Sequence, residues 1–235
     1  MRNNSTSIHV LGGMGPDASA KLYSRMISIS REKFGVRKNQ EYPDILLHSI
    51  PVPDFIEDLT QVEIAKNQIF EHMQLVKQRG GNVGIACNTA HLLIPDLTAY
   101  FPKTIFISMP VEVAQEVKKR RFKKVGILAS PTTIVTGIYQ QELAKLHLEF
   151  ALPDFDDIDE LGAIILEIVG GNLTMGKRLL KVADRLKKKG VDALILGCTE
   201  LPLVFPEYYS LPILNSLDIL ANALLKAYYK ERRSL

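Results

Sequence analysis

Two cysteines occupy positions in this sequence where side chains could do chemistry. Cys87 directly follows the apolar run at residues 83–86, Cys198 follows a second apolar run at residues 193–197, and the chain has no other cysteine. Short continuous apolar runs are typical of buried strands in a parallel sheet, and ligands bind at the carboxyl ends of such strands. We therefore expect the two thiols to face a single site built from two matching halves.

A matched pair of thiols could invert a carbon centre. One thiolate removes a proton from a carbon acid, and the opposite thiol returns a proton to the other face. No cofactor is needed if hydrogen-bond donors stabilise the charge that develops on the adjacent carboxylate, and Asn88, Thr89 and Thr199 follow the cysteines directly. A helix start at each cysteine should also lower the thiol pKa. The alternative role for either cysteine is packing as a small apolar side chain.

Strands and helices alternate along the whole chain, which favours parallel sheets with right-handed crossovers. The pattern begins again near residue 125, so we expect an α/β fold of two similar halves: residues 1–108 plus 211–235, and residues 109–210. The strands are expected at residues 8–11, 45–50, 83–86, 104–108, 125–130, 149–152, 193–197 and 211–214. The helices are expected at residues 16–33, 62–79, 89–100, 111–120, 131–146, 158–169, 175–189 and 216–229.

Composition indicates an ordinary globular protein that stays in the cytoplasm. The 235 residues are 46% hydrophobic and 23% charged, with a net charge of +3. No stretch approaches the roughly 20 apolar residues that cross a bilayer, so we expect no membrane partner. Basic runs at residues 118–124 and 185–189 fit solvated helix ends better than a nucleic-acid surface. The scattered histidines show no metal-ligand spacing, so we expect no metal.

Three short motifs, taken in this order and spacing, resemble the aspartate/glutamate racemase family, and most closely its aspartate racemases. They are Gly-Gly-Met-Gly-Pro at residues 12–16, Cys-Asn-Thr-Ala-His at residues 87–91 and Gly-Cys-Thr-Glu at residues 197–200. The resemblance covers essentially the whole chain. It implies two pseudo-symmetric flavodoxin-like halves with the active site between them, racemisation by two cysteines without pyridoxal phosphate or any other cofactor, and a homodimer.

The resemblance also assigns roles by position. Cys87 and Cys198 become the two acid–base residues, and a small amino acid becomes the substrate. Its carboxylate and amine would be held by Asn88, Thr89 and Thr199. Met14, Thr132 and Thr133 would line the cavity. Glu200 would either tune the neighbouring thiol or cap the following helix, and we include it among the candidate substrate-binding residues.

Two positions depart from the aspartate racemase pattern. Phe55 follows Pro53-Asp54, where those enzymes usually carry an arginine that grips the side-chain carboxylate of the substrate. Ile168 and Val169 stand where a lysine is usual. Because an unpaired buried carboxylate costs several kcal/mol, we predict an amino-acid racemase of broader or less acidic range.

Other interpretations remain open at this point. Residues 13–18 also match a dinucleotide-binding fingerprint after a strand, although the expected acidic residue at the end of the second strand is missing. Hydantoin racemases and maleate isomerases of the same superfamily also use a cysteine pair. A thiol redox protein is a further alternative, but the chain lacks Cys-x-x-Cys. His91 is more often a packed side chain than a proton relay.

Overall fold

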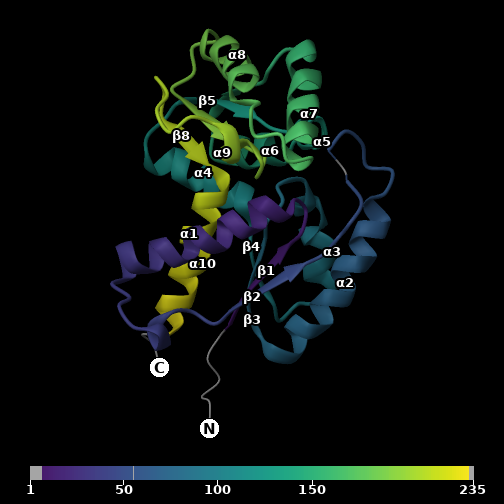
Figure 1. Cartoon of the computed structure of the whole chain (residues 1–235), viewed down its shortest axis with the longest axis vertical. Coiled ribbons are helices and arrows are strands. Elements are labelled where there is room, and N and C mark those ends of the chain that lie inside the picture. The colour runs from purple at the N-terminus through teal and green to yellow at the C-terminus, as the bar shows by residue number, and fades with distance from the viewer. Residues whose placement is uncertain (1–6, 55, 233–235) are drawn as a thin grey trace.

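The computed structural model of the chain describes residues 7–54 and 56–232, which form two α/β halves stacked along the long axis (Figure 1). Each half is built on a four-stranded parallel sheet, in the orders β2-β1-β3-β4 and β6-β5-β7-β8. The matching orders confirm the expected fold of two similar α/β halves. The strands are β1 (Ser7–Gly12), β2 (Ile45–Ser49), β3 (Gly81–Ile85), β4 (Ile105–Ile107), β5 (Lys124–Leu128), β6 (Glu149–Ala151), β7 (Ala193–Leu196) and β8 (Ile213–Asn215).

Helices connect the strands and cover the sheets (Figure 1). In the first half they are α1 (Pro16–Phe34), the 3-10 helix η1 (Asn39–Glu41), α2 (Val62–Arg79), the 3-10 helix η2 (Thr89–Leu93) and α3 (Ile94–Tyr100). The later helices are α4 (Met109–Lys119), α5 (Pro131–Thr136), α6 (Ile138–Lys145), α7 (Phe155–Val169), α8 (Gly176–Lys187), α9 (Leu201–Val204) and α10 (Ser216–Arg232). Among the described residues, no helix combines the length and the apolar character needed to cross a bilayer.

Two expected helices are divided in the structure. The helix predicted over residues 89–100 begins as the 3-10 helix η2 and becomes α-helical at Ile94, where Pro95 occupies the first turn of α3. The helix predicted over residues 131–146 is broken at Gly137, which adopts a left-handed conformation with φ +70°. Glycine tolerates that conformation because it has no Cβ, so the chain turns there and starts α6 in a new direction.

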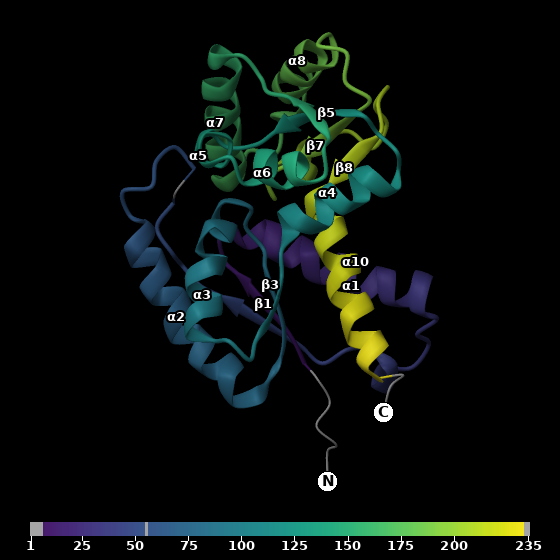
Figure 2. The ribbon, with the colours of Figure 1, turned by 180° about the vertical axis from the view of Figure 1, so that it is seen from behind.

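The C-terminal segment is shared between the two halves. Strand β8 pairs with β7 in the second sheet, which departs from the expected grouping of residues 211–235 with the first half. Only the one-turn helix α9 separates β7 from β8, so the chain stays beside β7. Helix α10 then packs against α1 and β3 of the first half and against α4 (Figure 2). The division at residues 108 and 109 itself stays a prediction.

One buried apolar cluster passes through both halves. It includes Ile8 of β1, Ile127 of β5, Val113 of α4 and Leu220 of α10, all fully buried. Burying a side chain of this size stabilises the fold by about 2 kcal/mol. Because members from both sheets share this cluster, the separation of the two halves is set by core packing.

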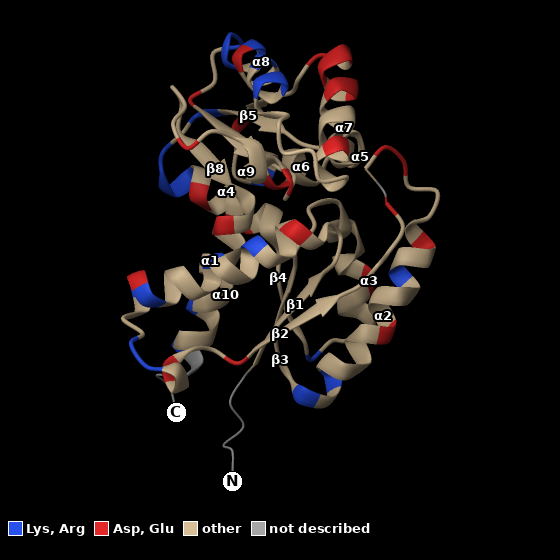
Figure 3. Ribbon diagram, viewed as in Figure 1, with Lys and Arg blue, Asp and Glu red and all other residues tan. Residues whose placement is uncertain are grey.

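The two basic runs end helices, as predicted. Lys118 and Lys119 lie in the last turn of α4, and Arg185 and Lys187 lie in the last turn of α8 (Figure 3). Cations are favourable there because the helix dipole is negative at that end. Arg185 also forms an ion pair with the buried carboxylate of Asp157 on α7.

Three histidines pack together at the first sheet: His9 on β1, His48 on β2 and His72 on α2. His9 Nε2 lies 3.1 Å from the Gly80 carbonyl oxygen and must therefore carry the proton, which leaves His9 Nδ1 to accept from His48 Nε2 at 3.0 Å. The ring of His72 stands edge-on to His48. Burial lowers the pKa of His48 to about 4, with smaller contributions from the charges of His9 and His72. His48 is therefore neutral at pH 7, and burial lowers the pKa of His9 as well.

This cluster predicts a specific acid sensitivity. The folded chain keeps His48 neutral, whereas the unfolded chain protonates it near pH 6.5, so its contribution is complete above pH 6.5 and is lost as the pH falls toward 4. The free energy of unfolding should fall by up to about 3 kcal/mol over that window because of this group. In His48→Gln, the side-chain amide still donates to His9 but does not titrate. Urea unfolding from pH 7 to 4 should give a shallower pH dependence for this variant, and equal slopes would contradict the assignment.

Candidate active site

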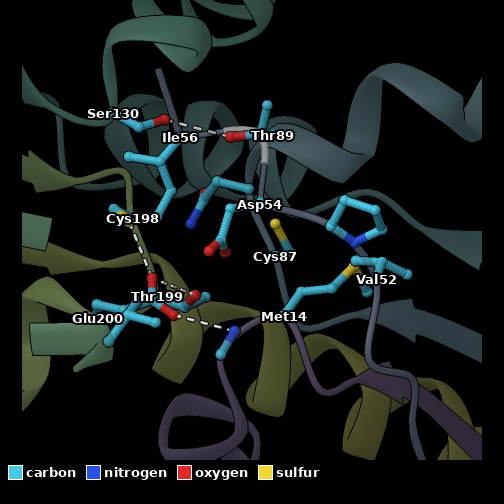
Figure 4. A pocket seen from close by; sticks show the side chains of 14 residues that line it. Met14, Val52, Asp54, Ile56, Cys87, Thr89, Ser130, Cys198, Thr199 and Glu200 are labelled. Atoms are coloured by element: carbon cyan, nitrogen blue, oxygen red, sulfur yellow. Dashed lines mark hydrogen bonds between the residues drawn. The ribbon is translucent and has the colours of Figure 1, made fainter. Parts of the chain in front are cut away.

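A pocket opens between the two halves, with side chains from both (Figure 4). The space between its atoms, including the opening to solvent, is about 420 Å³. It contains both cysteines, so the structure brings together the two strand ends that the sequence singled out. The lining residues are Met14, Gly15, Val52, Pro53, Asp54, Ile56, Cys87, Asn88, Thr89, Ser130, Val169, Cys198, Thr199 and Glu200.

Each cysteine lies just beyond the carboxyl end of a central strand. Cys87 follows β3 and precedes η2, and Cys198 follows β7 and precedes α9. β3 and β7 are both internal strands of their sheets, so apolar layers fix them on both faces. The thiols therefore enter the pocket from opposite halves.

Thr132 and Thr133 lie behind the pocket and are not among its lining residues. The Thr132 hydroxyl donates to the carbonyl of Ile56 at 3.0 Å, and Thr133 Oγ1 lies 2.7 Å from Thr89 Oγ1. Ser130 joins the same hydroxyl cluster, 3.2 Å from Thr89 (Figure 4). These two threonines thus support residues that line the cavity, whereas the sequence led us to expect them in its wall.

The carboxylate of Glu200 bonds to three neighbours within the pocket. Its Oε2 accepts from the Cys198 thiol at 2.9 Å and from the Thr199 hydroxyl at 3.0 Å, and its Oε1 accepts from the Gly15 amide at 3.3 Å (Figure 4). Its side chain forms no capping hydrogen bond to helix α9. Of the two roles considered for Glu200, the structure therefore supports contact with the thiol.

Both thiols are harder to ionise than the sequence suggested. Burial raises the pKa of Cys87 to about 12, helped by the charges of Glu200 and Asp54, although backbone N–H groups of Ala90 and Thr89 act in the opposite direction. Burial and the Glu200 contact raise the pKa of Cys198 well above its usual value. The expected lowering by the helix start is therefore outweighed. Both cysteines are therefore neutral thiols near pH 7.

The sequence analysis did not assign Asp54, Val52 or Ile56 to the pocket. Asp54 comes from the proline-rich loop after β2, and Val52 and Ile56 of the same loop also face the cavity. The prolines at 51 and 53 hold this loop extended, which was its only local signal. Of the two positions where lysine is usual, Val169 lines the pocket and Ile168 is buried in the core. Phe55 lies outside the described residues.

His91 is a neutral side chain that holds the backbone at Cys87 in place. Its Nε2 accepts from the backbone N–H of Met109 at 3.0 Å, so Nδ1 carries the proton and donates to the carbonyl of Cys87 at 2.8 Å. Burial lowers the pKa of His91 to about 4. With both nitrogens engaged, His91 ties the Cys87 loop to the start of α4, which agrees with a packed side chain and not a proton relay.

The glycine-rich loop after β1 faces this pocket. The amide of Gly15 donates to Glu200, and the amide of Gly13 donates to the Ser19 hydroxyl at 2.9 Å. A phosphate cradle needs such amides to be free. The loop therefore serves the cysteine site, which argues against the dinucleotide interpretation. Within residues 7–54 and 56–232, no group of histidine, cysteine and acidic side chains is placed to hold a metal ion.

Comparison with known proteins gives the family. The family model described as Asp/Glu/Hydantoin racemase matches residues 11–224. The chain belongs to this family. It is therefore an isomerase of a racemase family, which confirms the resemblance drawn from the three motifs.

Individual relatives fit the same class. Broad specificity amino-acid racemase RacX of Bacillus subtilis is 23% identical over 94% of this chain and 97% of its own length. The structure of Picrophilus torridus aspartate racemase matches with a TM-score of 0.83 and 28% identity, covering 95% of this chain and 94% of the other. An aspartate racemase homologue from Pyrococcus horikoshii matches with a TM-score of 0.78 and 28% identity, covering 95% and 99% of the two chains.

Removing the charge of Glu200 should make the thiols more reactive. In Glu200→Gln the negative charge that raises both thiol pKa values is gone, so their titrations move to lower pH and the thiolate fraction rises. Iodoacetamide should then alkylate Cys87 several-fold faster at pH 8, as followed by mass spectrometry. Glu207→Gln removes an exposed carboxylate elsewhere and is the matched control. An unchanged alkylation rate in Glu200→Gln would contradict this account of the thiol pKa.

Proposed function

We propose that the protein is a cofactor-independent amino-acid racemase in which Cys87 and Cys198 move the Cα proton, and that it prefers substrates with neutral side chains. The observation that carries the proposal is a single pocket with one thiol from each half and a largely apolar wall. Two thiols on opposite sides of a bound Cα provide the acid and the base that inversion requires.

The charges of the pocket support an amino acid as the ligand. Asp54 and Glu200 line the cavity, and no lysine or arginine is found among its described lining residues. An ammonium group is the natural complement to these two carboxylates, of which Glu200 is buried and Asp54 is exposed. Asn88, Thr89 and Thr199 supply amide and hydroxyl groups for the substrate carboxylate. In this arrangement both ends of a zwitterion have partners.

The same ammonium group helps the thiols to ionise. A positive charge within a few ångströms favours a thiolate over a thiol, so binding opposes the rise in pKa that burial and Glu200 impose. The thiol of Cys198 already donates to Glu200, whose own pKa is raised by burial. Glu200 is thus placed to take that proton as Cys198 becomes the base. Substrate binding and ionisation of the sulfur that acts as the base are thereby coupled.

The apolar wall of the pocket determines which substrate side chains we expect it to prefer. Val52, Ile56 and Val169 face the cavity beside Met14. A second carboxylate on the substrate would lie among these groups and two acidic residues without a cation, at a cost of several kcal/mol. We therefore infer that neutral amino acids are turned over faster than aspartate or glutamate.

Solvent deuterium exchange tests the proposed chemistry. Purified enzyme without added cofactor is incubated in D₂O with a panel of neutral and acidic L-amino acids, and proton NMR follows loss of the Cα signal while chiral chromatography follows inversion. We expect both for neutral substrates, and a loss of inversion by about a hundredfold or more in Cys87→Ser and Cys198→Ser. Exchange with no amino acid at all would overturn the racemase assignment, and turnover of aspartate alone would overturn the preference.

A cation at position 169 should shift substrate preference. Val169 is 36% exposed at the pocket wall, so Val169→Lys can keep its ammonium hydrated while reaching a substrate carboxylate. We expect kcat/KM for L-aspartate relative to L-alanine to rise about tenfold, equivalent to about 1.4 kcal/mol. Val169→Met has similar length without the charge and should leave the ratio near that of the natural protein. Equal ratios in the two variants would place the substrate side chain elsewhere.

We also propose a homodimer, as the family resemblance implies, and a cytoplasmic location, as the composition indicates. Light scattering should give about twice the chain mass of 26.3 kDa. A monomer at micromolar concentration would contradict the dimer without affecting the assignment of the two thiols.

A further inference from the structure

Tyr139 of helix α6 joins the two halves directly behind the cysteines. Its side chain is fully buried, and its hydroxyl donates to Oδ1 of Asn88, the residue that follows Cys87. Nδ2 of the same amide donates to the Ser216 hydroxyl at 3.3 Å, and Ser216 in turn bonds to the Tyr139 oxygen. The three side chains come from the second half, the first half and the start of α10, and they close a small ring of hydrogen bonds.

The ring of Tyr139 contacts the loop that carries the other cysteine. A Cβ added at Gly197 would lie 2.9 Å from Cε2 of Tyr139, so the aromatic ring rests directly against the backbone that precedes Cys198. A glycine is needed at 197 because any larger side chain would displace that ring. Tyr139 therefore contacts the nearest chain neighbour of each catalytic thiol, one through its hydroxyl and one through its ring edge.

We propose that Tyr139 is a positioning residue that sets the spacing of Cys87 and Cys198 across the pocket. The proposal rests on the two-thiol racemase function. A phenol ring is a rigid spacer with two rotatable bonds, so few conformations are lost when it is fixed in a core. The contacts run from Cys87 to Asn88, through Tyr139, to Gly197 and Cys198.

The hydrogen bonds of Tyr139 also fix the orientation of the Asn88 amide. Because Oδ1 accepts from the phenol and one Nδ2 hydrogen goes to Ser216, the second Nδ2 hydrogen remains for the pocket, which Asn88 lines. Without the phenol hydroxyl the amide could turn and present its oxygen to a substrate carboxylate. Tyr139 thus affects substrate binding by orienting the Asn88 amide. It affects the distance between the two thiols by contacting both cysteine loops.

Spacing matters because inversion uses both faces of Cα. The thiolate on one side takes the Cα proton, and the thiol on the other side must be within reach to donate its own proton to the opposite face. If the second thiol is displaced by about 1 Å, abstraction continues but delivery from the far side slows by up to about a hundredfold. The thiol that took the Cα proton then exchanges its hydrogen with D₂O and returns a deuteron to the same face of the carbanion, so the substrate exchanges its Cα proton without inverting.

This difference gives a readout that loss of stability alone does not change. In D₂O, the ratio of deuterium in the recovered starting enantiomer to product formed reports exchange without inversion. We expect Tyr139→Leu to raise this ratio about tenfold or more, since it removes both the ring contact and the hydroxyl. Leu143→Ala, at a buried position one turn further along α6, is the matched control for destabilisation and should leave the ratio unchanged.

Tyr139→Phe isolates the hydroxyl and keeps the ring against Gly197. It should fold like the natural protein, raise KM through the freed Asn88 amide and move the exchange ratio less than Tyr139→Leu does. In an Asn88→Ala background, Tyr139→Phe should have little further effect on KM, because the hydroxyl acts through that amide.

The outcomes separate this inference from the proposed function. If the natural protein shows neither exchange nor inversion with any amino acid, the racemase proposal fails and the role of Tyr139 fails with it. If the natural protein racemises but Tyr139→Leu and Leu143→Ala give the same ratio, the spacing role alone is overturned. Additive effects of Tyr139→Phe and Asn88→Ala on KM would overturn the action through the amide.

Discussion

The site is governed by the electrostatic cost of ionising two buried thiols beside carboxylates. Cys87 and Cys198 share a pocket with Asp54 and Glu200, and burial and negative charge both favour the protonated thiol. A permanently ionised cysteine pair would be exposed to alkylation and oxidation. In the proposed mechanism the pair ionises only when an ammonium group enters, so it is protected until the substrate arrives. The carboxylates would then make thiol ionisation depend on substrate binding.

The two-sheet fold meets a second requirement, which is that each thiol approach from its own side. Parallel strands deliver their following residues to one edge, and the matching strand orders put Cys87 after β3 and Cys198 after β7. Core packing shared by α4, α10 and both sheets then holds the two edges opposite each other. Because helix α10 leaves the second sheet and packs on the first, the halves are tied by the backbone as well as by side chains.

Local patterns were sufficient to predict the strands, their parallel arrangement and the convergence of the two cysteines. Each of these follows from an apolar run and the residues next to it in sequence. Tyr139 was missed because a buried aromatic residue in a helix carries no local sign that its hydroxyl crosses to the other half. Whether the side chains of Thr132 and Thr133 reach the pocket depends on how the two halves pack together. The thiol pKa depends on where the Glu200 side chain points, which no spacing in the sequence encodes.

In this pocket the residues that hold the two cysteine loops in place differ from the residues that affect thiol ionisation, and there is a chemical reason for this. His91 and Tyr139 hold the loops around the cysteines, and both are buried and neutral: the two nitrogens of His91 are engaged by backbone groups, and burial raises the pKa of Tyr139 far above its usual range. A charged clamp this close to the sulfurs would shift their ionisation along with their position. Neutral side chains at these two positions let the fold fix the distance across the pocket without changing the charge near the sulfurs. In the proposed mechanism, burial, Asp54 and Glu200 then set how readily a thiol loses its proton when an ammonium group binds.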